Sequence, residues 1–312
     1  MVTTSVDEIH PNLKQLSNSS SVTLHRCERR YELDKLMPQV QDPDHHLRFG
    51  SVVGIGVQEL LTTLSLDKAL WSVFLAWDAA LEADEGSSEW KDKKTFWHAL
   101  AAIEKFNVPM QGCFANFRLA TLAGRPATEI GFSIDCGDGF FYRGFIDAVM
   151  IDTSSNEIVV IECKTTKFSK VHEAQYKNSG QALGYALLID AIIKSEGLSY
   201  GSSYKVYYPV YKTGALEWEV FPFTKTSTKR ALWIKDILLD INHIIERATD
   251  GYFPMRGESC YEFFRPCPHF GRCEYDNKML FSGSPPVVRE ERKSKYDFHF
   301  SLAEIIEGQL AS

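Results

Sequence analysis

The chain has 312 residues, of which 44% are hydrophobic, and its 34 Lys and Arg against 41 Asp and Glu give a formal net charge of −7. This length and apolar content fit one large α/β domain with helical additions. No apolar run approaches the roughly 20 residues of a membrane span, and the N-terminus lacks a basic region followed by an apolar one, so we expect a cytoplasmic protein without a secretory signal. The acidic balance argues against a protein that coats nucleic acid, but it is compatible with a nuclease, because local clustering of charge decides the field.

The N-terminal part is predicted to become helical after a polar start. Residues 1–21 are expected to be frayed. Residues 22–36 have apolar positions at helical spacing and predict a short helix with Cys27 near its start. Residues 47–64 predict a helix whose small residues allow close packing against a neighbour, namely Gly50, Gly54 and Gly56. A nucleotide-binding loop is the alternative, but no convincing strand precedes these glycines and no Lys-Ser/Thr pair follows them.

The middle of the chain changes its apolar period. Aromatic residues recur at helical spacing in 66–84 and 92–123, which predicts a helical insertion over 66–123 packed into a core. From Ala127 the period becomes two. Three antiparallel strands of a meander are predicted at 127–135, 138–152 and 157–166.

The rest of the chain alternates between helix and strand. We predict a helix at 172–196, two strands at 202–223 and a long helix at 226–251. A cysteine-bearing segment at 252–276 is followed by a polar linker and a C-terminal helix within 277–312, with Ser301 and Glu304 as a capping box. This order predicts a mixed α/β fold, with a single domain over 22–276 and a helical N-terminal elaboration.

The strongest chemical signal lies between Gly144 and Lys164. Asp147 ends one apolar run, Glu162 and Lys164 end the next, and the turn between them predicts a hairpin that brings the three together. Two hard carboxylates a few Å apart suit Mg²⁺ or Mn²⁺, and the backbone carbonyl of Cys163 is a candidate third ligand. Lys164 could hold an attacking water or stabilise charge that grows on phosphorus.

Gln181 and Tyr185 lie four residues apart on the next predicted helix. This spacing places both side chains on one face, where they could orient a phosphate or a base. By itself the pair is weak evidence, since surface Gln–Tyr pairs are common.

Together these residues resemble the PD-(D/E)XK nuclease superfamily. Asp147, the Glu-x-Lys at 162 and 164 and the Gln-x-x-x-Tyr at 181 and 185 follow the order and spacing of its RecB-like branch, which includes CRISPR-associated and phage exonucleases; Gly144 fits that branch's Gly-x-x-Asp pattern. The resemblance implies a restriction-endonuclease-like core, with a central mixed sheet flanked by helices. It also implies that Asp147 and Glu162 bind the metal, that Lys164 assists water, and that Gln181 and Tyr185 contact substrate.

The chain departs from that pattern in the upstream helix. The branch commonly has a His, an additional metal ligand, four residues after a Gly, but here Gly54 stands four residues after Gly50. Gln58 is the first candidate substitute and Glu59 the second; a Gln carbonyl is acceptable to Mg²⁺. Glu129 could also face the site, with a solvated strand end as the alternative.

Four cysteines could form a second metal centre. Cys260, Cys267 and Cys273 lie close together in sequence and Cys27 lies far upstream, an arrangement similar to the [4Fe–4S] clasp of several RecB-like nucleases. However, Phe264 takes the place of a cysteine separated by two residues from Cys267. Zinc with His269 as fourth ligand, or unligated thiols, are the alternatives, and we interpret the others, Cys113, Cys136 and Cys163, as core or bystander residues.

Basic and aromatic residues supply candidate contacts to DNA. Phosphate contacts are expected from Lys164, Lys167, Lys170, Lys177, Arg26, Arg29 and Arg30, unless these form a solvated face. Phe168 and Tyr176 could stack on bases, with core packing as the alternative.

These signals favour a metal-dependent DNA nuclease, an exonuclease on single-stranded DNA or DNA ends, in repair, recombination or phage- or CRISPR-type processing. A helicase, a recombinase or CRISPR-adaptation proteins are candidate partners. One alternative is a DNA-binding module of the same fold with weak or no cleavage. Another is a structural metal-binding protein in which Lys164 pairs with the carboxylates by chance.

Overall fold

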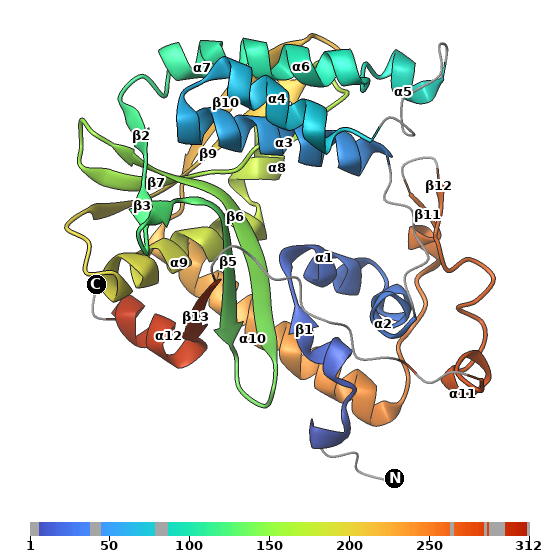
Figure 1. The fold of residues 1–312 in the computed structure, drawn as a ribbon. Helices are drawn as coiled ribbons and strands as arrows, with labels where there is room; N and C mark the ends of the chain where they lie inside the picture. The colour runs from blue at the N-terminus through green and yellow to red at the C-terminus, as the bar shows by residue number, and fades with distance from the viewer. Residues whose placement is uncertain are drawn as a thin grey trace. The chain divides into compact units, whose positions relative to one another are not determined.

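The computed structural model describes residues 6–37, 45–78, 87–262, 265–283, 286 and 297–310, and the chain divides into two compact units (Figure 1). Unit 1 comprises Met1–Val40, Gly131–Gly144 and Ala231–Ser312, and unit 2 comprises Gln41–Ile130 and Phe145–Arg230. The architecture is mixed α/β, with parallel and antiparallel strands flanked by helices, which confirms the predicted fold class.

The strands of unit 2 form a mixed sheet around a buried apolar run. β7 is buried along most of its length, which suits its Ile and Val residues, and it pairs antiparallel with β6 and parallel with β9. β9 pairs antiparallel with β10 and parallel with β8, and β2 pairs antiparallel with the C-terminal end of β6, at Met150–Asp152. The bounds are β2 (Phe117–Leu119), β3 (Thr121–Leu122), β4 (Arg125–Pro126), β5 (Thr128–Asp135, shared with unit 1), β6 (Phe141–Asp152, shared with unit 1), β7 (Glu157–Ile161), β8 (Lys164–Thr166), β9 (Gly201–Lys212) and β10 (Glu217–Thr224).

Helices complete unit 2. A parallel pair of strands needs a crossover connection, and α8 and α9 supply it between β8 and β9. α3, α4, α6 and α7 form a layer above the strands in Figure 1, and side chains of the first three share one core with β6, β7 and β9. The bounds are α3 (His45–Thr63), α4 (Leu66–Ala76), α5 (Ser88–Lys91), α6 (Phe96–Lys105), α7 (Asn107–Gln111), α8 (Glu173–Lys177) and α9 (Gly180–Ser195).

Unit 1 joins segments from both ends of the sequence. β1 pairs parallel with the start of β6, and β13 pairs parallel with β5. The buried Glu28 carboxylate at the start of α2 accepts hydrogen bonds from Arg247 and Arg256, at 2.8 and 2.9 Å. The elements are η1 (Val6–Glu8), η2 (Pro11–Lys14), β1 (Gln15–Leu16), α1 (Asn18–Arg26), α2 (Glu28–Leu36), α10 (Ser227–Asp250, mostly unit 1), η4 (Gly257–Ser259), β11 (Tyr261–Glu262), β12 (Arg265–Pro266), α11 (Asn277–Leu280), β13 (Asp297–Ser301) and α12 (Leu302–Leu310).

Three segments differ from the sequence-based expectation. Residues 6–21, expected to be frayed, form short helices and β1, and Ser17 and Ser20 cap α1 reciprocally. Residues 22–36 form parts of two helices rather than one, because Cys27 adopts an extended backbone between them. The expected helix over 92–123 ends at Gln111, since residues 117–119 pair with the C-terminal end of β6 instead.

The C-terminal helix α12 begins with the capping box that the sequence predicts. Ser301 and Glu304 form it, with N–H to side-chain distances of 3.0 and 3.1 Å.

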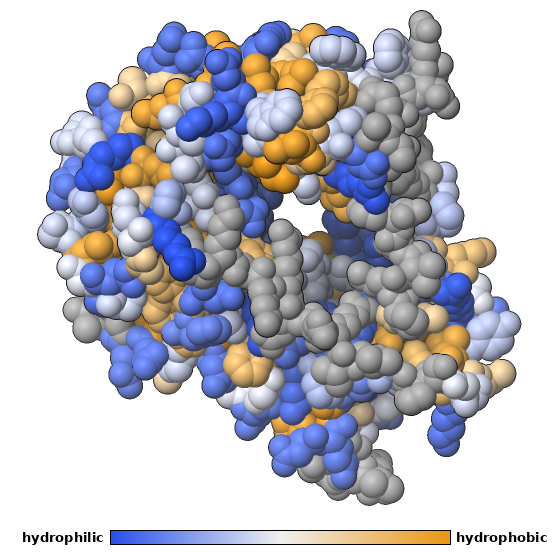
Figure 2. Space-filling view, viewed as in Figure 1, coloured by the Kyte–Doolittle hydropathy of each residue, from blue (hydrophilic) through white to orange (hydrophobic). Residues whose placement is uncertain are grey.

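Apolar residues gather on the surface around α4 (Figure 2). None of the helices in the described part of the chain combines the length and apolar character that crossing a membrane requires.

The close approach of α3 to its neighbours depends on Gly56. A Cβ atom added there would lie 2.6 Å from both Ile103 and Val73, whose side chains are fully buried, whereas one added at Gly54 would meet no atom within 4 Å. We therefore expect Gly56→Ala to lower the free energy of unfolding by about 1–2 kcal/mol through overpacking. The matched Gly54→Ala should raise it by up to about 1 kcal/mol through helix propensity. Urea unfolding of both variants measures the difference, and equal effects would contradict the close packing.

Candidate active site

The end of β7 and the middle of β6 bring the predicted acidic residues together. The antiparallel register pairs Ala148 with Ile161, so Glu162, which follows β7, comes opposite Asp147. The backbone N–H of Cys163 donates to Asp147 Oδ2 at 2.8 Å, and that of Glu162 donates to the Tyr207 carbonyl. Strand pairing therefore fixes both carboxylates through the main chain, although Glu162 and Cys163 lie just beyond the strand in which we expected them.

A polar network connects Glu162 to the next helix. Glu162 Oε1 accepts hydrogen bonds from Lys164 Nζ at 2.6 Å and from Gln181 Nε2 at 2.8 Å. Lys164 Nζ also donates to Gln181 Oε1 at 3.2 Å. Gln181 Nε2 lies 2.5 Å from the Tyr185 hydroxyl, which donates to the Phe145 carbonyl at 2.6 Å. The two predicted motifs thus meet in one hydrogen-bonded cluster.

One oxygen of this cluster has no partner. Glu162 is only 3% exposed, and its Oε2 atom forms no hydrogen bond with any group of the described residues. A buried carboxylate oxygen without a partner is costly unless a ligand satisfies it. The residues fit a hard divalent cation, because carboxylate oxygens are the donors that Mg²⁺ and Mn²⁺ prefer.

The charges of the site shift the pKa values of two residues in the same direction. Burial, followed by the nearby Glu162 carboxylate, raises the pKa of Asp147 well above its ordinary value. Burial alone would lower the pKa of Lys164, but the carboxylates of Glu162 and Asp147 outweigh that effect and raise it. Lys164 therefore remains an ammonium at neutral pH, while the two carboxylates repel one another until a cation lies between them.

Gln58 is placed beside a third acidic residue. Its Nε2 atom donates to Glu129 Oε1 at 3.2 Å. Glu129 is half-buried, its backbone has φ +52°, and its charge raises the pKa of Asp147, so it lies close to the site rather than at a solvated strand end. A left-handed backbone at a non-glycine residue is a mark of functional positions. In the sequence, the position of Glu129 near the site was indicated only by an isolated acidic residue at the start of a predicted strand.

No larger cluster of metal-binding side chains is formed. Across the described ranges, no three His, Cys, Asp or Glu side chains come together in a group that could hold a metal ion. A cation between Asp147 and Glu162 would therefore take its other ligands from the backbone and water, which suits Mg²⁺. Glu59 lies instead beside Trp71, in the lining of a different hollow.

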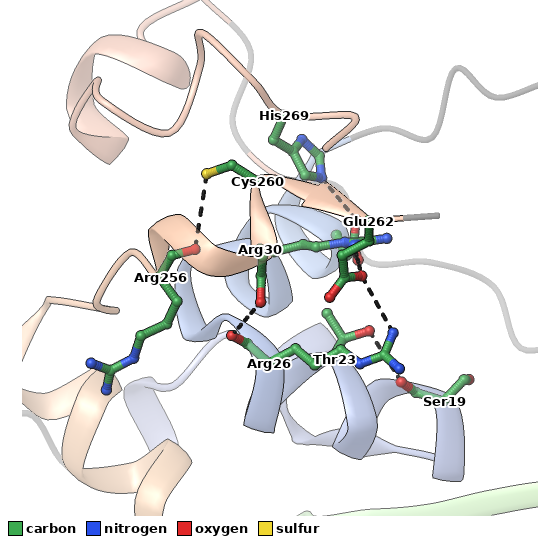
Figure 3. Close-up of polar contacts among 10 residues, drawn as sticks. Ser19, Thr23, Arg26, Arg30, Arg256, Cys260, Glu262 and His269 are labelled. Carbon is green, nitrogen blue, oxygen red and sulfur yellow. Dashed lines mark hydrogen bonds and ion pairs between the residues drawn. The ribbon is translucent and has the colours of Figure 1, made fainter. Parts of the chain in front are cut away.

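The four predicted cluster cysteines all lie in unit 1, and the Cys27 and Cys267 thiols interact electrostatically, but among the described residues no three of the four come together in a group that could hold a metal ion. Cys27 is buried at the start of α2, and the Cys260 thiol is directed at the Arg256 carbonyl, 3.9 Å away (Figure 3). His269 Nε2 donates to Asp34 Oδ1 at 2.7 Å. In the part of the chain that the structure describes, the iron–sulfur prediction therefore finds no support, and neither does the zinc alternative.

The upstream basic residues have structural partners. Arg29, a predicted phosphate contact, is 7% exposed and pairs with Glu32. Arg26 and Arg30 both lie near Glu262, at 3.3 and 3.4 Å (Figure 3). These arginines connect the N-terminal helices to the cysteine segment within unit 1.

The downstream residues differ in their exposure. Lys167 is exposed and lies 3.3 Å from Asp92, and Lys170 and Phe168 are also exposed. Tyr176 packs instead against Tyr208 and Phe221, with ring centroids 4.8 and 6.0 Å away, so core packing accounts for it.

Comparison with known proteins gives one informative match. The family model for the PD-(D/E)XK nuclease superfamily matches residues 15–276. A search of curated proteins gives no match. Two similar solved structures are a protein from Eubacterium rectale named "Putative exonuclease" (12% identity, 94% of this chain and 97% of that chain, TM-score 0.49) and SSO0001 (12% identity, 72% and 76%, TM-score 0.31). At these TM-scores structural likeness supports no inference, so the family match carries the assignment.

The raised pKa of Asp147 predicts how stability depends on pH. A carboxyl group whose pKa is higher in the folded than in the unfolded state stabilises the fold below its unfolded pKa, about 3.9, and this contribution is lost as pH rises through the folded pKa. In EDTA at neutral pH, Asp147→Asn should therefore have a higher melting temperature than the unsubstituted protein, and the difference should disappear near pH 3.

Asp152, on the same strand, provides a control of opposite sign. Hydrogen bonds from the Ser154 side chain and backbone lower the pKa of Asp152, so its contribution is present at neutral pH and lost as pH falls. Asp152→Asn should lower the melting temperature at neutral pH. Thermal melts across pH test both variants, and a destabilised Asp147→Asn would contradict the interpretation.

Proposed function

The chain belongs to the PD-(D/E)XK nuclease superfamily, whose members hydrolyse phosphodiester bonds, and from this premise we propose a metal-dependent deoxyribonuclease that acts as an exonuclease on single-stranded DNA or DNA ends. The observation that carries the proposal is the Glu162 carboxylate. One of its oxygens is bonded to Lys164 and Gln181, and the other is buried without a partner among the described residues. A buried carboxylate oxygen that accepts no hydrogen bond from the described residues is suited to binding a cation.

The proposed roles follow from the contacts. Asp147, Glu162 and the Cys163 carbonyl would hold Mg²⁺ or Mn²⁺, with Gln58 and Glu129 beside them. The bound ion would supply Lewis-acid activation of water and neutralise charge on the phosphate. Lys164, as a permanent ammonium 35% exposed, can orient a water molecule and stabilise negative charge on the phosphoryl oxygens. Gln181 and Tyr185 hold the Lys164–Glu162 pair in place.

DNA contact is assigned to the segment between β8 and α8. Lys167, Lys170 and Phe168 are exposed there, directly after the strand that begins with Lys164. Two cations beside an exposed aromatic ring match the combination that single-stranded nucleic acid requires. The Gly144-x-x-Asp147 spacing supports the RecB-like branch.

A binding module without cleavage is the second candidate. Gly54 motivates it, because no side chain at this position can supply the imidazole that related nucleases use. The intact Asp147–Glu162–Lys164 cluster favours the enzyme.

Cleavage should depend on Lys164. We expect Lys164→Ala and Glu162→Gln to lower the rate of nucleotide release from labelled single-stranded DNA in Mg²⁺ or Mn²⁺ by at least about 100-fold, the usual cost of removing one group that stabilises developing charge. Lys235→Ala, an exposed position on α10, is the charge-matched control and should cleave normally. If the unsubstituted protein releases no nucleotide, the binding module replaces the enzyme; degradation of circular DNA would replace exonuclease with endonuclease action.

The segment after β8 should control affinity. Each phosphate contact contributes to the salt dependence of binding, so the double variant Lys167→Ala, Lys170→Ala should weaken binding to single-stranded DNA by about tenfold and reduce the slope of log K against log salt by about 1.4. Fluorescence anisotropy in Ca²⁺ or EDTA at several salt concentrations measures both quantities. An unchanged slope would show that these lysines do not contact phosphate.

A further inference from the structure

A set of large apolar side chains is exposed on the two neighbouring helices α4 and α6. We define the α4–α6 face as Trp71, Phe74, Leu75 and Trp97, which are 60%, 53%, 67% and 71% exposed. Figure 2 shows apolar residues gathered over this part of unit 2. Single exposed apolar residues are common, whereas the largest contiguous apolar patch of a protein surface is often functional.

Ring contacts make the face continuous. Trp71 and Phe74 stack with centroids 5.1 Å apart, Phe74 meets Phe96 at 6.2 Å, and Phe96 meets Trp97 at 5.4 Å. The aromatic side chains therefore support one another, and little rotamer freedom remains to be lost on binding. Aromatic side chains fixed in this way are the residues that dominate the affinity of protein interfaces.

The charges around the face favour a protein partner over nucleic acid. Asp67 and Lys68 are exposed at the start of α4, and Glu104 and Lys105 at the end of α6. Because Phe96 at the start of α6 contacts Phe74 and Trp77 at the end of α4, the helices run in opposite directions and these two balanced pairs lie at the same end of the face. Single-stranded nucleic acid needs a positive groove as well as aromatic rings. A balanced pair of charges can instead be matched by a copy of itself across a twofold axis, since such an interface places the same surface on both sides.

The area is sufficient for a dimer. Large aromatic side chains cover about 150–250 Å² each, so the exposed fractions of Trp71, Phe74 and Trp97 amount to roughly 300–450 Å² per copy. With Leu75 added, a symmetric pair would bury on the order of 1,000 Å², the lower limit for a biological interface. A hollow of about 410 Å³ beside the face, lined by Glu59, Asp67, Lys68, Trp71, Ser72 and Leu75, can receive a protruding side chain of a second copy.

We propose that the α4–α6 face is the contact surface of a symmetric homodimer of this chain. The proposal is independent of the nuclease function, because none of its residues belongs to the site around Glu162.

Sedimentation over about 1–100 µM chain tests the proposal, because this range extends well above micromolar and so detects a weak dimer of small interface area. The unsubstituted protein should reach the mass of two chains. The double variant Trp71→Lys, Trp97→Lys should weaken dimerisation by at least 100-fold and remain monomeric, with an unchanged thermal midpoint at low concentration, where both proteins are monomers and the substituted side chains are already exposed.

Leu239→Lys is the matched control, because Leu239 is 64% exposed on α10 and outside the face. It should dimerise normally. A monomeric unsubstituted protein at all concentrations would overturn the proposal, as would a dimer that survives the double substitution. If the protein is monomeric and the double variant loses affinity for single-stranded oligonucleotides, the face binds bases instead.

Discussion

The burial of the Glu162 carboxylate is the constraint on which the candidate site depends. A charged group taken out of water costs several kcal/mol unless other groups compensate it. Lys164 and Gln181 compensate one oxygen from two different elements, β8 and α9. Any slip of the β6–β7 register by one residue would turn Asp147 to the opposite face and leave Glu162 without its neighbours. The β6–β7 pairing, the crossover that carries α9 and the polar network must therefore all form for the Glu162 carboxylate to remain buried.

The crossover positions α9, and a buried lysine fixes the end of α8, which comes just before it in the chain. Lys225 is fully buried, and its Nζ donates to the carbonyls of Tyr176 and Lys177 at the end of α8, at 3.0 and 2.8 Å. Burial lowers the pKa of Lys225 to about 8. The carbonyls at a helix C-terminus are where a cation is most favourable. This contact fixes the corner between α8 and α9, four residues before Gln181.

Sequence patterns predicted the parts of the molecule that local spacing determines. The alternating apolar residues of β6, β7 and β9 and the Glu-x-Lys and Gln-x-x-x-Tyr spacings identified both the sheet and the network. They could not show that residues 117–119 pair with the C-terminal end of β6, because that contact joins distant segments and overrides local helix preference. The basic cluster around Arg29 was only partly readable. Glu32 and Asp34, three and four residues after Arg29 and Arg30, are helical ion-pair partners that the sequence spacing shows. The partner that Arg26 and Arg30 share, Glu262, lies at the other end of the sequence and leaves no local pattern.

The most informative departure is at Gly54, because it changes the chemistry expected of the site. A Cβ atom added there would meet nothing within 4 Å, so α3 is not held at this position by close packing. One turn further along α3, Gln58 donates to Glu129 and thereby presents a carboxylate beside Asp147. Imidazole suits transition metals, whereas carboxylate and amide oxygens suit Mg²⁺, which prefers oxygen and retains water. Among the described residues Asp147, Glu162 and Glu129 do not form a group that could itself hold a metal ion. The chain thus has, near its acidic pair, a third carboxylate that is hydrogen-bonded by the amide of Gln58.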